Sequence, residues 1–194
     1  MSVNPVQLVP LKRHGDDRGW FAETYSQRAF AARGLSETYV QDNHSLSRQA
    51  GVVRGLHFQT PPHGQAKLVR CVRGSIFDVA VDVRRGSPTY GRWVGAVLSA
   101  DNGDQLAIPV GFAHGFMTLE PDTEVIYKVT DFYAPAHDGG LIWNDPAIGV
   151  EWPAPAAQPI LSPKDLALGR LADFDSPFPY DGRPLAPLVN QSSG

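Results

Sequence analysis

The sequence contains a single cysteine, Cys71. One thiol cannot form an internal disulfide bond, which excludes a disulfide-stapled scaffold and fits a reducing compartment. No run of about 18 apolar residues occurs, and no basic region followed by an apolar stretch opens the chain, so neither a membrane span nor a secretory signal is predicted. We therefore expect a cytoplasmic protein that does not bind membranes.

The sequence also lacks a strong excess of charge of either sign. Its 17 Lys and Arg against 20 Asp and Glu give a formal net charge of −3. Bulk charge therefore gives no reason to expect a nucleic acid or an anionic membrane as partner, and any anionic ligand must be met by local groups. The 194 residues, 42% of them apolar, are enough for one domain with a substantial core.

What the sequence does have, from residue 51 onward, is alternation of apolar and polar residues. In residues 75–83, Phe77 and three valines share one face, while Asp78 and Asp82 lie on the other. Further strands are expected at residues 7–12 (at a sheet edge, because Pro10 cannot donate to a central ladder), 39–45, 92–99, 105–108, 112–119 and 123–133. Strands about every ten residues, separated by turn residues, are typical of an antiparallel sandwich or barrel.

Two short helices are expected beside the strands. The first covers residues 27–33, with Ser26 as its N-cap, and the second begins after the cap residue Ser162. The end of the chain is rich in Pro, Asp and Gly, which favours irregular structure. The prediction is a single domain over residues 1–170, followed by an irregular C-terminal tail over residues 171–194.

The stretch Gly51–Gly74 combines chemically useful side chains with turn residues. It places His57 and Lys67 on either side of a Pro-Pro turn, with Arg54 and Arg70 close by. A base and a cation carried on two neighbouring strands and joined by a rigid turn indicate a site built on a scaffold.

Two spacings in the chain are similar to the paired motifs of the cupin superfamily, small antiparallel jelly-roll barrels. In the first, Gly51 precedes His57 and Lys67 precedes Gly74; in the second, Gly103, Pro109, Gly111 and His114 fall in register. Where other cupins hold a metal with three histidines and a glutamate, this chain has His57, Gln59, Lys67 and His114. An ammonium adds positive charge where a dication would sit, and only two good donors remain. We therefore expect the pocket of a cupin without its metal.

A longer series of segments closely resembles the dTDP-4-dehydrorhamnose 3,5-epimerases of deoxysugar biosynthesis. The segments are Asp16–Glu23, Gln41–Ser45, Arg54–Gln59, Lys67–Cys71, Phe77–Asp82, Ser87–Gly91, Gly111–Phe116, Tyr127–Tyr133 and Trp143–Pro146, in the family's order. The resemblance implies an all-β jelly-roll (cupin) barrel with short peripheral helices. It also implies an isomerase that inverts C3 and C5 of a dTDP-4-keto-6-deoxyhexose without a cofactor, and a homodimer whose subunits exchange strands to complete each site.

The resemblance also implies roles for individual residues. His57 is the base, Tyr127 the acid on the opposite face, and Lys67 the cation that stabilises the enolate oxygen. Asp165 orients the base. The positions expected to bind the nucleotide sugar are Arg18, Glu23, Gln41, Asn43, Arg54, Gln59, His114, Tyr133, Asp138 and Trp143.

Each catalytic assignment has a structural alternative. His57 could be a hydrogen-bonded core histidine, and Lys67 a solvated lysine at a strand end. Tyr127 alternates with two valines, as a core tyrosine would. Asp165 occupies the third position of the expected helix, where an acid is common.

Three other functions are consistent with parts of this pattern. Some relatives invert a single carbon, either C3 or C5, of a related nucleotide sugar. A cupin that binds a sugar nucleotide without catalysis would lack the acid or the base, and both are present here. A metal-dependent cupin is opposed by Gln59 and Lys67.

Overall fold

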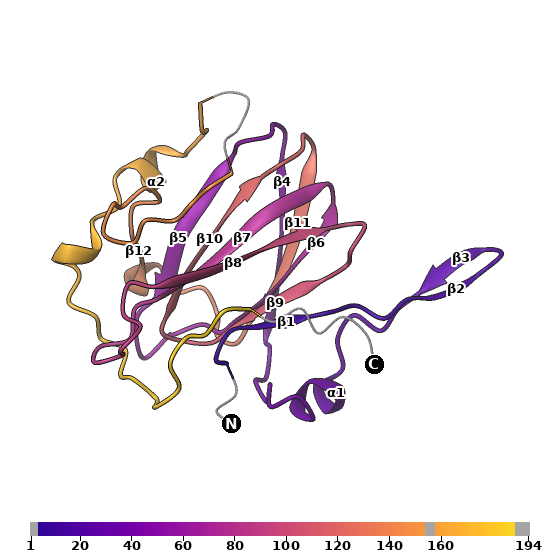
Figure 1. The fold of residues 1–194 in the computed structure, drawn as a ribbon, viewed down its shortest axis with the longest axis horizontal. Helices are drawn as coiled ribbons and strands as arrows, with labels where there is room; N and C mark the ends of the chain where they lie inside the picture. Colours follow the sequence, from indigo (N-terminus) through magenta and orange to yellow (C-terminus); the bar gives the residue numbers. More distant parts are fainter. Residues whose placement is uncertain (1–3, 154–157, 189–194) are drawn as a thin grey trace.

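The computed structural model describes residues 4–153 and 158–188, and their architecture is two antiparallel five-stranded sheets that face each other (Figure 1). The first sheet has the order β1-β9-β6-β11-β4, and the second has the order β12-β5-β10-β7-β8. A separate hairpin, β2–β3, projects from the barrel. The all-β antiparallel jelly-roll (cupin) barrel with short peripheral helices is confirmed.

Most strands match the expected ones, with ends shifted by a few residues, and β12 was not expected. The first sheet contains β1 (Gln7–Val9), β9 (Gln105–Ile108), β6 (Lys67–Arg73), β11 (Thr123–Val129) and β4 (Gln41–Ser47). The second contains β12 (Asp138–Gly140), β5 (Val53–Gln59), β10 (Phe112–Thr118), β7 (Ser75–Asp82) and β8 (Trp93–Ser99). The hairpin is β2 (His14–Asp16) and β3 (Gly19–Phe21). Strand β1 lies at a sheet edge, as Pro10 predicts.

The relation between His57 and Lys67 differs from the prediction. Strands β5 and β6 are consecutive in sequence but belong to different sheets, so they are not paired neighbours. The loop of residues 60–66, which contains the Pro-Pro turn, therefore crosses from one sheet to the other. The two side chains meet across the barrel and not along one sheet.

Strand β7 is buried on both faces. Its valines pack outward against Leu141, Ile148 and Phe178, from segments that cover the second sheet. Its other face points into the core between the sheets, with Ile76 and Ala80. Asp78 lies on that inner face and is completely buried. The polar residues of this strand are therefore not on a solvated face.

The helices are short and peripheral, as predicted. They are α1 (Gln27–Ala31), η1 (Pro135–His137), α2 (Pro163–Leu166) and η2 (Leu171–Asp173). Ser26 occupies the N-cap position of α1, but its side chain makes no capping bond. Ser162 does cap α2, because its side chain accepts a hydrogen bond from the amide of Asp165. No helix in residues 4–153 or 158–188 is long and apolar enough to cross a membrane.

The described part of the C-terminal segment is tied to the barrel by a buried arginine. Arg84 donates to Asp82 at 2.9 Å through Nε and to Asp181 at 2.7 Å through Nη1. Phe178 adds an almost fully buried ring. The division of the chain at residue 170 stays a prediction.

Two glycines let β5 and β10 approach closely beside the histidines. A β-carbon on Gly115 would lie 2.8 Å from the carbonyl oxygen of Arg54, and one on Gly55 would lie 2.5 Å from the α-carbon of Gly115. His57 pairs with His114 directly along the same two strands. The absence of side chains at these glycines thus sets the spacing of the strands that carry both imidazoles.

We expect Gly115→Ala to destabilise the fold, because the added methyl group meets backbone that cannot move aside. The cost of such overpacking is about 1–3 kcal/mol, measurable as a lower midpoint of urea unfolding. Gly169→Ala is the matched control, since its β-carbon would have no neighbour within 4 Å. Equal midpoints for the two variants would contradict the close-packing argument.

Candidate active site

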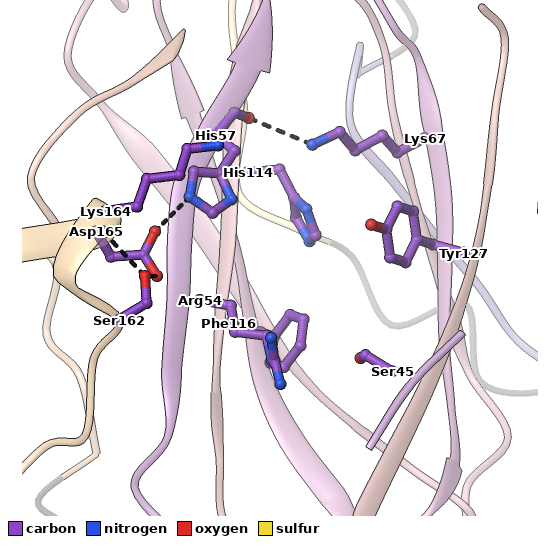
Figure 2. A pocket seen from close by; sticks show the side chains of 10 residues that line it. All are labelled: Ser45, Arg54, His57, Lys67, His114, Phe116, Tyr127, Ser162, Lys164 and Asp165. Carbon is purple, nitrogen blue, oxygen red and sulfur yellow. Dashed lines mark hydrogen bonds and ion pairs between the residues drawn. The ribbon is translucent and has the colours of Figure 1, made fainter. Parts of the chain in front are cut away.

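A cavity of about 290 Å³ opens between the two sheets next to helix α2. Side chains from both sheets and from α2 point into it (Figure 2). Its lining residues are Ser45, Arg54, His57, Lys67, His114, Phe116, Tyr127, Ser162, Lys164 and Asp165. All four predicted catalytic residues are therefore brought to one place.

His57 is held by Asp165 at one wall of this cavity. The His57 Nε2 and Asp165 Oδ1 atoms are 2.5 Å apart, and the carboxylate side chain is only 6% exposed. Because a carboxylate accepts, Nε2 carries the proton and Nδ1 keeps its lone pair on the cavity side (Figure 2). Burial lowers the pKa of His57 and outweighs the nearby carboxylate, which raises it. The imidazole is thus set up as a neutral base.

Asp165 is both an acid in the first turn of a helix and a partner of His57. Its Oδ1 contacts His57, while Oδ2 accepts a hydrogen bond from the hydroxyl of Ser162 at 2.7 Å. The amide of Asp165 donates to the same hydroxyl at 3.1 Å. The residue is at the third helical position and also reaches the base, because α2 lies against β5.

Lys67 comes from the opposite sheet and is buried, with 7% of its surface exposed. Its ammonium donates to the carbonyl oxygen of His57 at 3.3 Å (Figure 2). Burial lowers the pKa of Lys67 to about 8, although Asp78 and Asp138 act in the opposite direction. It is not a solvated lysine at a strand end.

Tyr127 occupies the wall opposite His57 (Figure 2). It lies on β11 between two inward-facing valines, and its ring packs against the core between the sheets. Burial raises the pKa of its hydroxyl, which keeps the phenol protonated. The residue packs against the core, as in the structural alternative, and its ring also borders the cavity.

His114 forms a second imidazole–carboxylate pair with Asp78. Its Nε2 donates to Asp78 Oδ1 at 2.7 Å, and both side chains are buried. Sequence reasoning placed Asp78 only on the polar face of a strand and missed this contact. The alternation of side chains along a strand could have predicted Phe116 as a cavity residue, because it lies two positions after His114 on the same face. Phe116 does line the cavity.

The other expected binding residues near the mouth are engaged with one another or with backbone. The amide of Gln59 donates to His63 O and accepts from Ala134 N, both at 2.8 Å. Gln41 donates to Asn43 Oδ1 at 2.9 Å. Arg54 lines the cavity and also donates to Ser47 Oγ and to Leu46 O, both at 3.3 Å.

Asp138 joins three segments at the mouth. Its Oδ2 accepts a hydrogen bond from the hydroxyl of Tyr133 at 3.1 Å and also pairs with the ammonium of Lys164. Trp143 packs against Trp152 with ring centroids 6.3 Å apart. Lys164, which sequence reasoning missed, directly precedes Asp165 on α2.

Arg18 and Glu23 are not brought to the cavity of their own chain. Arg18 connects β2 to β3 at the tip of the projecting hairpin (Figure 1), and its side chain is 89% exposed. Its side-chain hydrogen-bond and ion-pair partner in the described residues is Asp16. Glu23 follows the hairpin and is also exposed.

No cluster of three or more His, Cys, Asp or Glu that could hold a metal ion occurs in the described ranges. Both cavity histidines direct Nε2 to a carboxylate. The expected absence of a functional metal stays a prediction.

Comparison with known proteins relates this site to a family. The family described as dTDP-4-dehydrorhamnose 3,5-epimerase matches residues 1–173. The protein of that name from Sinorhizobium fredii is 52% identical over 180 residues, which is 93% of this chain and 92% of the relative.

Solved structures of the same kind share the fold. A dTDP-4-dehydrorhamnose 3,5-epimerase from Bacillus anthracis, with TDP and PPi bound, is 47% identical, with a TM-score of 0.82 over 85% of this chain and 93% of that one. An epimerase from Legionella pneumophila in complex with dTDP-4-keto-L-rhamnose is 42% identical, with a TM-score of 0.85 over 90% and 92% of the two chains. The chain thus belongs to the dTDP-4-dehydrorhamnose 3,5-epimerase family.

Proposed function

We propose that this protein is a cofactor-independent epimerase that inverts C3 and C5 of dTDP-4-dehydro-6-deoxyglucose to give dTDP-4-dehydrorhamnose. The observation that carries the proposal is the position of a neutral imidazole and a tyrosine on opposite walls of one cavity, with an ammonium beside them (Figure 2). These three groups are what such an inversion needs.

The chemistry follows from the ketone at C4. Each neighbouring C–H bond is acidic because the carbanion delocalises into the carbonyl as an enolate. His57 removes the proton through Nδ1, and Tyr127 returns a proton from the other face. Lys67, which is buried, stabilises the negative oxygen that develops.

The proposed ligand carries a diphosphate, which requires fixed positive charge. Arg54 and Lys164 both line the cavity, and arginine forks suit phosphate. The relatives solved with TDP and with a dTDP-keto sugar support a ligand of this class. Nucleotide-sugar contacts are also proposed for Gln41, Asn43, Gln59, His114, Tyr133, Asp138 and Trp143.

We also propose a homodimer in which the hairpin of one subunit completes the site of the other. The hairpin leaves the barrel (Figure 1), and β4, at the edge of its sheet, has β11 as its one strand neighbour in the described residues. An unpaired edge next to a site needs covering. A partner's hairpin would deliver Arg18 and Glu23.

The proposed location of the protein is the cytoplasm.

His57→Ala and Tyr127→Phe should fail in different ways when the substrate is incubated in D2O. Loss of the base should lower both turnover and deuterium exchange at C3 and C5, by about 10²–10⁴-fold. Without the tyrosine hydroxyl, His57 can still form the enolate and return a proton from the original face. Deuterium should then enter without matching inversion, as measured by NMR of the sugar carbons.

Tyr90→Phe, outside the cavity, is the control and should behave as wild type, with or without EDTA. Deuterium at one carbon only would identify a single-carbon epimerase. Binding without any exchange would identify a non-catalytic sugar-nucleotide protein. Normal inversion by Tyr127→Phe would remove Tyr127 from the mechanism.

The dependence of kcat/KM on pH should have two limbs. A base whose pKa is lowered stays active below the ordinary imidazole range near 6.5, so the acidic limb should lie at lower pH than that. Lys67 must be protonated, so activity should fall as pH rises through its pKa of about 8. In Lys67→Arg the guanidinium stays charged, so the fall near pH 8 should disappear, and activity should fall only at the higher pH where Tyr127, whose pKa is raised by burial, loses its proton. A limb that stays near pH 8 would assign it to another group.

Strand exchange should allow two defective subunits to complement each other. In a mixed dimer of Arg18→Ala and His57→Ala chains, one site would combine the intact His57 of one subunit with the intact Arg18 of the other. Refolding the two variants together should give about a quarter of wild-type activity, because half of the dimers are mixed and each has one complete site. Activity no higher than the mean of the parent variants would contradict a shared site.

A further inference from the structure

Asp78 is a buried carboxylate with few hydrogen-bond partners to offset the cost of its burial. It is completely buried on the inner face of β7. Its Oδ1 accepts from His114, but its Oδ2 has no hydrogen-bond partner among the described residues. Buried carboxylate oxygens are normally satisfied, so a missing partner requires an explanation.

Asp82, on the same face of β7, shows how a buried carboxylate is fully hydrogen-bonded. Asp82 is equally buried, but both of its oxygens accept hydrogen bonds, from Arg84, Ser87 and Thr89. Asp82 therefore has the partners of a structural ion pair. Asp78 does not, although it lies on the same strand only four residues before Asp82, with Ala80 between them on the same face.

What Asp78 does have is a position behind the reactive groups. It lies opposite Phe116 on β10, one inward position from His114, and β10 in turn pairs with the strand of His57. Its negative charge also acts on Lys67, whose pKa it raises against the effect of burial. Asp78 thus pairs directly with an imidazole of the cavity wall, and its charge acts on an ammonium of the same cavity.

We propose that Asp78 is a positioning residue of this site: it holds the His114 ring with Nδ1 toward the cavity, and it supplies the fixed negative charge that keeps the Lys67 ammonium protonated. The proposal rests on the proposed function, because the ammonium is needed where an enolate develops. This role explains why Oδ2 of Asp78 has no hydrogen-bond partner. A carboxylate that was paired with an arginine would attract the Lys67 ammonium less.

The effect depends on the other charges around Lys67. The groups that face the cavity with it are His57 on β5, His114 on β10, Tyr127 on β11, Arg54 on β5, and Lys164 and Asp165 on α2, with Asp138 on β12 at the mouth. Asp165 already pairs with His57, and Asp138 with Lys164. In the described residues Asp138 thus has a lysine as its ion-pair partner, whereas Asp165 and Asp78 each pair with a histidine. Of these last two, only Asp78 has a carboxylate oxygen without a hydrogen-bond partner there.

The test is Asp78→Asn, which keeps the shape and the acceptor for His114 but removes the charge. The basic limb of kcat/KM should move down by about one pH unit or more, the size of effect expected from a close opposite charge. The melting temperature should stay the same or rise, because an incompletely satisfied buried charge has been removed.

Asp82→Asn is the matched control, with the same substitution on the same face of the same strand. It should lower the melting temperature, because it removes one of the two carboxylates that pair with Arg84, and it should leave the basic limb in place. An active Asp78→Asn enzyme with the wild-type basic limb would overturn the proposal while leaving the proposed function intact.

A second measurement does not depend on activity. The chain has four lysines, Lys12, Lys67, Lys128 and Lys164, so labelled lysine side chains can be assigned and titrated by NMR in the free protein. The Lys67 resonance should titrate at lower pH in Asp78→Asn than in wild type. Identical titration would overturn the role of Asp78 even if the wild-type protein proved not to be an epimerase.

Discussion

The free-energy cost of placing charge between two apolar sheets governs this site. An unpaired ion in such an interior is unfavourable by several kcal/mol, so each charged or basic group in the cavity has a partner behind it. His57 has Asp165, His114 has Asp78, and Lys67 has the carbonyl oxygen of His57. These partners fix orientation, so the reactive atoms meet a substrate in a set geometry and with set protonation.

The barrel supplies this geometry by taking each group from a different strand. The base comes from one sheet, and the cation and the tyrosine come from the other. Close contact of Gly55 with Gly115 sets the distance between the two imidazole-bearing strands. The rigid parts of the fold thus hold the chemistry, while the mouth is formed by short segments such as α2.

Most of the fold follows from local sequence patterns, and part of the site does not. Alternation and turn spacing predict the strands, and Pro10 and Ser162 predict an edge and a helix start. A Pro-Pro turn, however, can close a hairpin or lead to another sheet, so the separation of His57 from Lys67 was missed. Asp78 was missed because a strand covered on both faces gives its polar residues no solvent to face.

The contact between His57 and Asp165 joins positions 108 apart in the chain. Contacts of such long range form slowly, because the entropy of closing a long loop is lost before the contact is made. The barrel strands precede α2 in sequence, so a chain emerging from the ribosome can complete its sheets before the carboxylate arrives. The carboxylate that orients His57 therefore reaches the barrel only when the four-residue helix α2 docks against β5.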